Sequence, residues 1–278
     1  MKLILRTIAL LTVSISSVSL GQEEGFTPLF DGKTLDGWTA ARGQGEDDWG
    51  SFSVNEAEQA IHAYAGKEAG SEQKTDCLVT DTEFSHYILK LEYKWLESRF
   101  APRADWDRDA GLLFHIHGDL KRVWPHSLEM QIGESPGDKP DAKGSAGRFH
   151  TGDLFVLGKH LRTDTPIGEN KRYAKDGKIR NGGSRRTPLG AEKPKGEWNE
   201  MELHVHGSEK ATFIFNGEVV LETSNFTQKN KAGEKLPLEK GHIGLQAEWA
   251  EILYRNIRIK ELTPKEANTT EEATTPKE

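Results

Sequence analysis

Apolar and polar side chains alternate strictly in several segments of the chain. Every odd-numbered position from 87 to 95 carries Tyr, Leu or Trp, with mostly charged residues between them. Because successive side chains of a β-strand point to opposite faces, this spacing predicts a strand with one buried face. Residues 198–206 alternate in the same way and lead into residues 211–215, Asn216-Gly217 and residues 218–221, which predict a β-hairpin.

Further short strands are expected throughout the chain. The segments are 51–54, 59–64, 76–80, 111–117, 127–132, 241–247 and 252–262. No segment keeps a helical period over three turns. Many short strands separated by Gly-rich turns predict an all-β fold, an antiparallel sandwich or jelly roll.

Two segments do not follow this pattern. Residues 158–196 are rich in Lys, Arg, Gly and Pro, and pieces such as residues 181–188 have the composition of an exposed loop. Loops of this length are usually functional or mobile, so we expect this one to border the site. Residues 263–278 contain only Thr, Pro, Lys, Glu, Ala and Asn, which predicts a disordered tail.

The N-terminus has the features of a cleavable signal peptide. Lys2 and Arg6 precede a largely apolar run at residues 8–20, which is too short to span a bilayer. Small residues at Ser19 and Gly21 predict cleavage after Gly21, and no Cys follows for a lipid anchor. We therefore expect residues 22–262 to form one periplasmic or secreted domain without a membrane anchor.

Charge and cysteine content narrow the function further. Removing residues 1–21 takes away two basic residues and no acidic one, so the net charge of -7 becomes more negative. An acidic domain is a poor binder of nucleic acid. The single cysteine, Cys77, lies in a predicted strand, where we expect it to be buried and inert.

Two predicted strands carry a carboxylate and an amide on one face. Glu129 and Gln131 alternate with apolar residues that take the core, and Gln246 and Glu248 repeat the arrangement. A carboxylate beside an amide suits general acid-base catalysis on a sugar, although an ordinary solvated strand face has the same pattern.

Tryptophans and histidines add to these candidates. Trp124 and Trp249 neighbour the polar sets, and exposed indole rings beside carboxylates suit stacking on sugars, although core packing is the commoner fate of Trp. Alternation also places His115 and His117 on one face, where the pair would suit a metal ion. Zinc needs at least a third ligand, so the pair alone is weak support for a metal site.

The chain has Phe-Asp-Gly-Lys-Thr-Leu-Asp-Gly-Trp at residues 30–38 and Arg-Asn-Ile-Arg-Ile-Lys at residues 255–260. These opening and closing segments resemble signatures of the 3-keto-disaccharide hydrolase domain family. The segments between them that follow the family's order are 108–114, 127–132, 196–199, 216–217 and 241–246. The resemblance covers about residues 26–262.

The resemblance implies a concanavalin-like jelly roll with a site on its concave face. It also implies cleavage of 3-keto-glycosides, by elimination of the C1 substituent and hydration of the glycal. A C3 ketone acidifies the hydrogen on C2, so this chemistry needs a base near C2, an acid near the leaving oxygen, and a donor or cation for the enolate.

Carried over residue by residue, the resemblance makes Glu129 the acid/base and Glu248 the second carboxylate. Gln131 and Gln246 are the orienting amides. The side chains it places along the cleft are Arg108, Asp109 and His115. Many members carry an Arg where this chain has His115 and His117, which leaves the oxyanion donor open, and a divalent cation held by the carboxylates, with or without His115, is one candidate.

Residues 133–153 are expected to close over the substrate, with Arg148, His150 and Asp153 among them. The substrate would be a 3-keto-sugar or another carbohydrate. Because the chain has no dinucleotide fingerprint and is expected to be exported, oxidation at C3 would fall to a separate upstream oxidoreductase.

Two other functions are known for proteins with a jelly-roll fold. A retaining glycosidase on this fold typically presents Glu-x-Asp-x-Glu from one strand, whereas here the strand has Glu129, Gln131 and Gly133, which disfavours that mechanism. A non-catalytic carbohydrate-binding module is the stronger rival, since a jelly-roll fold does not determine function.

Overall fold

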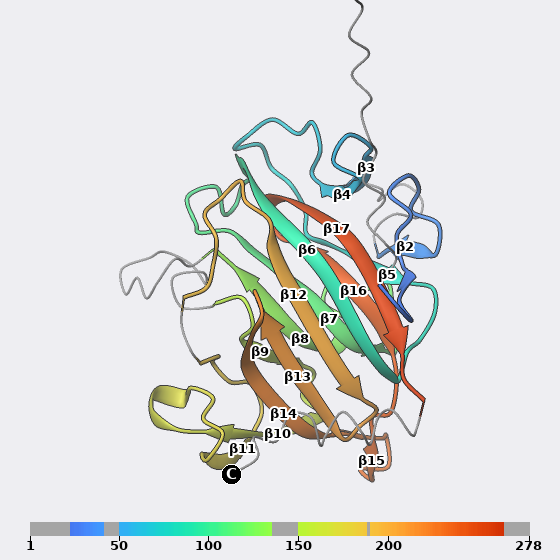
Figure 1. Cartoon of the computed structure of the whole chain (residues 1–278), viewed down its shortest axis with the longest axis vertical. Helices are drawn as coiled ribbons and strands as arrows, with labels where there is room; N and C mark the ends of the chain where they lie inside the picture. The colour runs from blue at the N-terminus through green and yellow to red at the C-terminus, as the bar shows by residue number, and fades with distance from the viewer. Residues whose placement is uncertain (1–22, 42–49, 135–149, 188–189, 264–278) are drawn as a thin grey trace, which may run out of the picture.

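The computed structural model describes residues 23–41, 50–134, 150–187 and 190–263. The predicted signal peptide, Arg148 and the predicted tail beyond residue 263 lie outside this range. Within it the chain forms antiparallel β-sheets and one short 3-10 helix, η1 (Glu169–Lys171) (Figure 1). None of its helical segments has the length and apolar character needed to cross a membrane.

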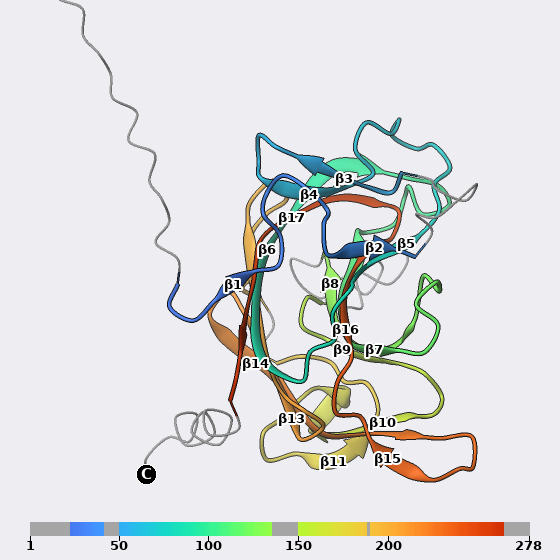
Figure 2. The same ribbon diagram turned by 90° about the vertical axis from the view of Figure 1, so that its right-hand side faces the viewer.

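The described strands build two sheets that pack face to face (Figure 2). The larger sheet runs in the order β11 (Lys178–Asn181), β10 (Leu161–Ile167), β14 (Glu218–Lys229), β13 (Lys210–Phe215), β12 (Asn199–His206), β6 (His86–Arg99), β17 (Ala250–Glu261), β4 (Ala60–Ala63) and β3 (Phe52–Asn55). At its margins β1 (Thr27–Pro28) pairs with β17, and β15 (Lys235–Pro237) with β14. The smaller sheet runs β2 (Trp38–Ala40), β5 (Asp76–Thr80), β16 (His242–Ala247), β7 (Asp109–His117), β8 (His126–Gly133) and β9 (Leu154–Leu157).

The core lies between the two sheets and is filled by the alternating apolar positions. In β6, the odd-numbered Tyr, Leu and Trp residues from 87 to 95 are all buried. From β8, Leu128, Met130 and Ile132 enter the same core. The opposite face of β8, which carries Glu129 and Gln131, therefore lies on the outer side of the smaller sheet. The all-β sandwich expected from the sequence is confirmed.

The hairpin predicted at Asn216-Gly217 forms between β13 and β14. Both turn residues have positive φ, 47° at Asn216 and 84° at Gly217. A two-residue turn with positive φ at both positions matches the right-handed twist of the flanking strands, and Asn and Gly adopt that conformation most readily.

Residues 158–196 are not the exposed loop that their composition suggested. They contain β10 and β11, which extend the larger sheet beyond β14. The inward positions of β10 include Thr163 and Thr165, whose hydroxyls bond to that of Thr223. Because polar threonines fill these buried positions, the segment lacks the apolar alternation that marks other strands. Arg186, further along, is fully buried.

A bulge in β7 corrects the predicted faces of its last residues. The pairing with β8 shifts register between Phe114 and His117, and His115 has φ 52°. An extra residue in one strand reverses the alternation beyond it. His115 is therefore buried against Phe226, and Ile116 packs on the opposite face with Leu113. The expectation that His115 and His117 share the outer face is wrong.

Candidate active site

Strand register brings the polar residues of β7, β8 and the end of β16 together on the outer face of the smaller sheet. Gly111 pairs with Gln131, and Asp109 pairs with Glu248, the residue after β16 ends. Residues directly opposite each other in an antiparallel pair point to the same side. Five polar side chains thus converge on this face, and we call them the carboxylate cluster: Asp109, Glu129, Gln131, Gln246 and Glu248, all buried.

Gly111 makes room at the centre of the cluster. A Cβ at this position would stand 2.2 Å from Glu129 Oε1 and 2.3 Å from Gln246 Oε1. The two oxygens are therefore neighbours above the glycine. Gln246 Oε1 has no hydrogen-bond partner among the described residues, so the pair is relieved of repulsion when Glu129 carries a proton and can donate it.

Glu248 is held by donors from two other segments. Trp124, in the β7–β8 loop, donates its indole N–H to Oε1 of Glu248. Arg103, in the segment after β6, lies 3.1 Å from Asp109 Oδ2 and 3.9 Å from Glu248 Oε2. These contacts favour the ionised form of Glu248.

Two buried tyrosines fix the backbone around Glu248. The Tyr64 hydroxyl donates to the carbonyl of Ala247 at 2.8 Å, and the Tyr254 hydroxyl donates to the carbonyl of Gln246 at 2.7 Å. Trp249 follows with a φ of 59° and donates its indole N–H to the Gln73 carbonyl at 2.7 Å. The chain therefore leaves β16 in a defined conformation that aims Glu248 at the cluster.

Aromatic rings and one guanidinium border the carboxylates. The ring centroids of Trp124 and Trp249 lie 6.5 Å apart, and 41% of Trp124 is exposed to solvent. Arg103 stacks 4.4 Å over Trp249 and 4.7 Å over Trp106. Open indole rings beside hydrogen-bonding groups suit the apolar face of a pyranose.

The electrostatics of the cluster favour protonated carboxyls. Burial, then the charges of Glu248 and Asp109, raise the pKa of Glu129 well above its usual range. Burial and the Asp109 charge raise the pKa of Glu248 to about 8, while Trp124 and Arg103 oppose the shift. Neighbouring carboxyls in a low dielectric cannot all ionise. The two groups that stabilise a negative charge, Trp124 and Arg103, lie beside Glu248. Glu129 is therefore the acid that keeps its proton longer.

The structure brings together seven of the ten predicted site residues: Asp109, Trp124, Glu129, Gln131, Gln246, Glu248 and Trp249. It adds Arg103, which the sequence reasoning missed. Arg103 lies in residues 100–108, where no alternation marks a face and no motif marks a ligand, so only the fold shows that its guanidinium reaches the acids.

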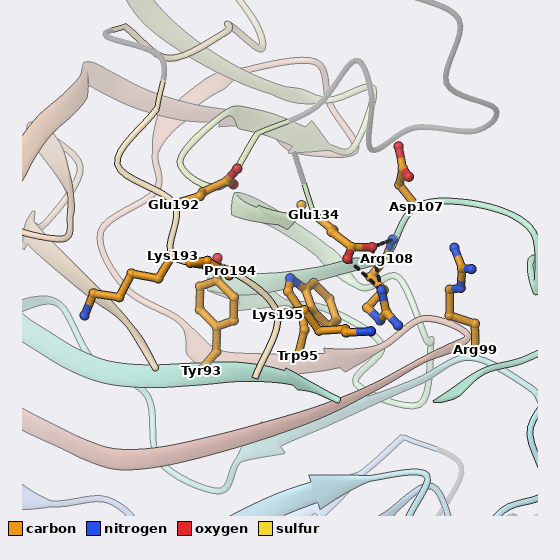
Figure 3. A pocket seen from close by; sticks show the side chains of 11 residues that line it. Tyr93, Trp95, Arg99, Asp107, Arg108, Glu134, Glu192, Lys193, Pro194 and Lys195 are labelled. Atoms are coloured by element: carbon orange, nitrogen blue, oxygen red, sulfur yellow. Dashed lines mark hydrogen bonds and ion pairs between the residues drawn. The ribbon is translucent and has the colours of Figure 1, made fainter. Parts of the chain in front are cut away.

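Arg108 lies elsewhere. Its guanidinium pairs with Glu134, with Nη1 2.6 Å from Oε1 (Figure 3). Its Nη2 donates to the Glu97 carbonyl. It lines a cavity of about 420 Å³ that is also bordered by the core residues Tyr93 and Trp95. Because adjacent residues of an extended chain point in opposite directions, Arg108 and Asp109 cannot both face the cluster.

His115 also lies away from the carboxylates, and His150 is bound to Asp153. The His115 ring is on the core side of the bulge, with Nε2 2.9 Å from the Gly207 carbonyl, and burial lowers its pKa to about 4. The His150 backbone N–H donates to Asp153, which also accepts from Arg185. These contacts hold residues 150–153 against residues 185–186. The His115 ring is therefore not in the cleft, where the resemblance placed it.

Cys77 lies on the outer face of β5, opposite Gln246 in register. It is fully buried, and burial, followed by the nearby acid charges, raises the pKa of its thiol well above the usual value. The prediction of a buried thiol is confirmed, and its protonated form is a poor nucleophile.

One group of three metal-ligating side chains occurs among the described residues. It consists of His117, His126 and His160, whose ligand atoms all lie within 4.8 Å of one another. The carboxylate cluster itself contains no such group within that part of the chain. The histidines lie at the opposite end of the β7–β8 pair from Asp109 and Gly133.

Comparison with known proteins extends these observations. The sequence matches the family described as 3-keto-alpha-glucoside-1,2-lyase-like domains over residues 25–260. No curated protein matches it. Two solved structures from Parabacteroides distasonis, both of proteins proposed to be glycosyl hydrolases, share the fold with a TM-score of 0.52 each. One is 21% identical and covers 85% of this chain and 99% of its own, and the other is 17% identical and covers 86% and 95%.

Proposed function

The chain belongs to the family of 3-keto-alpha-glucoside-1,2-lyase-like domains, which makes it a carbohydrate-active protein, and on that basis we propose that it cleaves 3-keto-glycosides. A base removes the proton from C2, the C1–O bond breaks as C1=C2 forms, and the leaving oxygen takes a proton from an acid. Water then adds across the new double bond, with OH going to C1 and H to C2. The net result is hydrolysis without a sugar-enzyme bond.

The observation that carries this proposal is the unequal pair of buried carboxyls. Glu129 is the acid that keeps its proton longer, so it suits protonation of the leaving oxygen. Glu248 accepts a hydrogen bond from Trp124 at Oε1 and has the Arg103 guanidinium 3.9 Å from Oε2, so it is the more readily ionised and suits abstraction of the C2 proton. Two titratable groups whose environments differ in this way can divide acid and base roles.

Arg103 suits stabilisation of the enolate oxygen that forms at C3. It is fixed by stacking on two indole rings and by Asp109, so little reorganisation is needed when charge develops. A divalent cation in this role remains a separate proposal, which loss of activity on chelation would support.

The open side of Trp124 supports a carbohydrate ligand at this face. Its ring lies beside that of Trp249 and is tied to Glu248, so a pyranose stacked there would present its C1–C2 edge to the acids. Gln131 and Gln246 then suit hydrogen bonding to sugar hydroxyls. Gln131 is already oriented by Asp109 and by the carbonyl of Ala110.

The proposal is tested by aglycone release from a 4-nitrophenyl 3-keto-glucoside and from the unoxidised glucoside. We expect turnover of the keto-sugar only, and loss of it in Glu129→Gln and Glu248→Gln. Glu251→Gln, which changes a half-buried carboxylate bound to His62 on the larger sheet, is the matched control and keeps full activity. Sugar binding without turnover in the unaltered protein would instead support a carbohydrate-binding module.

We also propose that the mature protein is exported and receives its 3-keto substrate from a separate oxidoreductase. The charged and apolar pattern of residues 1–21 supports export. Mass spectrometry of the native protein would show a first residue of Gln22. Retention of residues 1–21 in the native protein would contradict this.

A further inference from the structure

Three histidines from three separate elements meet at one end of the β7–β8 strand pair. His117 ends β7, His126 begins β8 and pairs with it across the strands, and His160 lies in the turn between β9 and β10. The Nε2 atoms of His117 and His160 are 3.2 Å apart, and the rings of His126 and His160 are 4.4 Å apart between centroids. All three are partly buried.

The hydrogen bond on the far side of His117 determines which of its nitrogens is available. Its Nδ1 lies 2.9 Å from the backbone carbonyl of His115, and a carbonyl can only accept. Nδ1 therefore carries the proton, and in the neutral ring the lone pair on Nε2 points at His160. A ligating histidine that donates its other N–H to a backbone carbonyl is the usual arrangement at protein metal sites.

The spacing matches that of imidazole ligands around zinc. Zn–N bonds of about 2.0–2.1 Å in a tetrahedron place neighbouring nitrogens about 3.4 Å apart. The 3.2 Å between His117 and His160 is close to that value, and the ligand atoms of all three rings lie within 4.8 Å of one another.

We propose that His117, His126 and His160 bind one divalent transition-metal ion, Zn²⁺ in the first instance, with water as the remaining ligand. Imidazole nitrogens suit Zn²⁺ over Mg²⁺ and Ca²⁺, which prefer oxygen. Metal binding needs neutral rings, in which each imidazole offers one nitrogen lone pair to the ion.

Arg122 would compete with the metal ion for the imidazole of His126. Its Nη1 lies 3.1 Å from His126 Nε2, and a guanidinium can only donate, so this nitrogen is an acceptor. If Nε2 binds the metal, its lone pair is used. If Nδ1 binds it, the proton of the neutral ring moves to Nε2, which then cannot accept. Either way the ion displaces Arg122, so removing this side chain should tighten binding.

The ion would brace the β7–β8 loop. His117 and His126 stand at the two ends of residues 118–125, and His160 would connect them to the β9–β10 turn. This loop carries Trp124, which donates to Glu248. The site is distinct from the carboxylate cluster, because His126 precedes Glu129 by three strand residues, or about 10 Å.

The test is metal titration of chelator-treated, desalted protein, followed by calorimetry with Zn²⁺ and by visible absorption with Co²⁺. We expect one ion per chain and Co²⁺ bands of a four-coordinate site. His160→Asn, in the turn, should weaken Zn²⁺ binding by at least about 100-fold, since even loss of an outer-shell partner costs about 10–100-fold. His117→Asn and His126→Asn should do the same, and Arg122→Ala should tighten binding.

His204→Asn is the matched control, because His204 is a partly exposed strand histidine paired with Glu202 on the larger sheet. It should bind Zn²⁺ as the unaltered protein does. Circular dichroism confirms the fold of each variant, and His160→Asn is decisive if the strand variants unfold. Absence of stoichiometric Zn²⁺ binding, or binding that survives His160→Asn, would overturn the proposal.

Discussion

The two ends of the β7–β8 strand pair carry different titratable side chains, carboxyls at one end and imidazoles at the other. At one end, buried carboxyls face one another around Gly111, and burial and mutual repulsion raise their pKa values. At the other end, half-buried histidines gather, and burial and nearby positive groups lower the pKa of His126 and His160. Burial favours the neutral form in both cases, which yields proton donors at the first end and metal ligands at the second.

The largest effect expected is at the carboxylate end. Glu248→Gln keeps the size of the side chain and removes the base, so we expect kcat/KM on a 3-keto-glucoside to fall by about 10²–10⁴-fold. His160→Asn, at the histidine end, should leave most of the activity in place. Equal losses in the two variants, measured by aglycone release, would show that the ends do not have separate roles.

Gly111→Ala tests whether the positions of the carboxylates matter as much as their presence. The added Cβ would overlap the ends of Glu129 and Gln246, which can move without disturbing the backbone. We expect a loss of about 100-fold in kcat/KM, typical of misplacement by about 1 Å, with a nearly unchanged melting temperature. Kinetics and thermal melts on the same preparation measure both. Full activity in this variant would contradict the placement of Glu129.

The pH dependence separates the acid from the base. Activity should rise with pH as Glu248 ionises, with its pKa near 8, and fall at higher pH when Glu129 loses its proton. In Glu248→Gln the rising limb should be absent from the residual activity. If kcat/KM stays constant in assays run from about pH 6 to about pH 9, these carboxyls do not act as proposed.

Stability should depend on pH in a related way. The folded pKa of Glu129 lies above the ordinary value of 4.5, so the stability it contributes is present below that value and is lost as pH rises through the folded pKa. Glu129→Gln cannot ionise, so we expect it to melt a few degrees higher than the unaltered protein at pH 8 and about equally at pH 4. A lower melting temperature at pH 8 would contradict this.

At the histidine end the expected effect is on stability and not on activity. Zn²⁺ at about 100 times its Kd should stabilise the folded chain by about 2.7 kcal/mol, a rise of several degrees in Tm. The same addition to His160→Asn should produce no rise. A rise in both would place the metal elsewhere.

Alternation predicted most of this fold because the sandwich buries one face of each central strand. It failed where inward positions are polar, as at Thr163 and Thr165 in β10, and where a bulge reverses the faces, as at His115. Period-two reasoning has no means of locating an inserted residue. Nor can it show that the ring of His117 lies beside those of His126 and His160, which come from β8 and a distant turn.

The candidate site was predictable in so far as it lies on strands. Glu129, Gln131 and Gln246 follow from alternation, and the resemblance added Asp109. Arg103 comes from an irregular segment, and its approach to the acids depends on how that segment folds over the sheet. Arg108 was misplaced because its sequence neighbour, Asp109, faces the site and consecutive residues cannot both do so.

The central claim is that cleavage proceeds through loss of the C2 proton. The most direct test uses a 3-keto-glucoside deuterated at C2 and follows the label in the released sugar at early times, before spontaneous exchange. We predict loss of the deuterium to water in step with aglycone release, with both processes slowed by about 10²–10⁴-fold in Glu248→Gln. Release of the aglycone with the C2 deuterium retained would contradict elimination and indicate direct hydrolysis at C1.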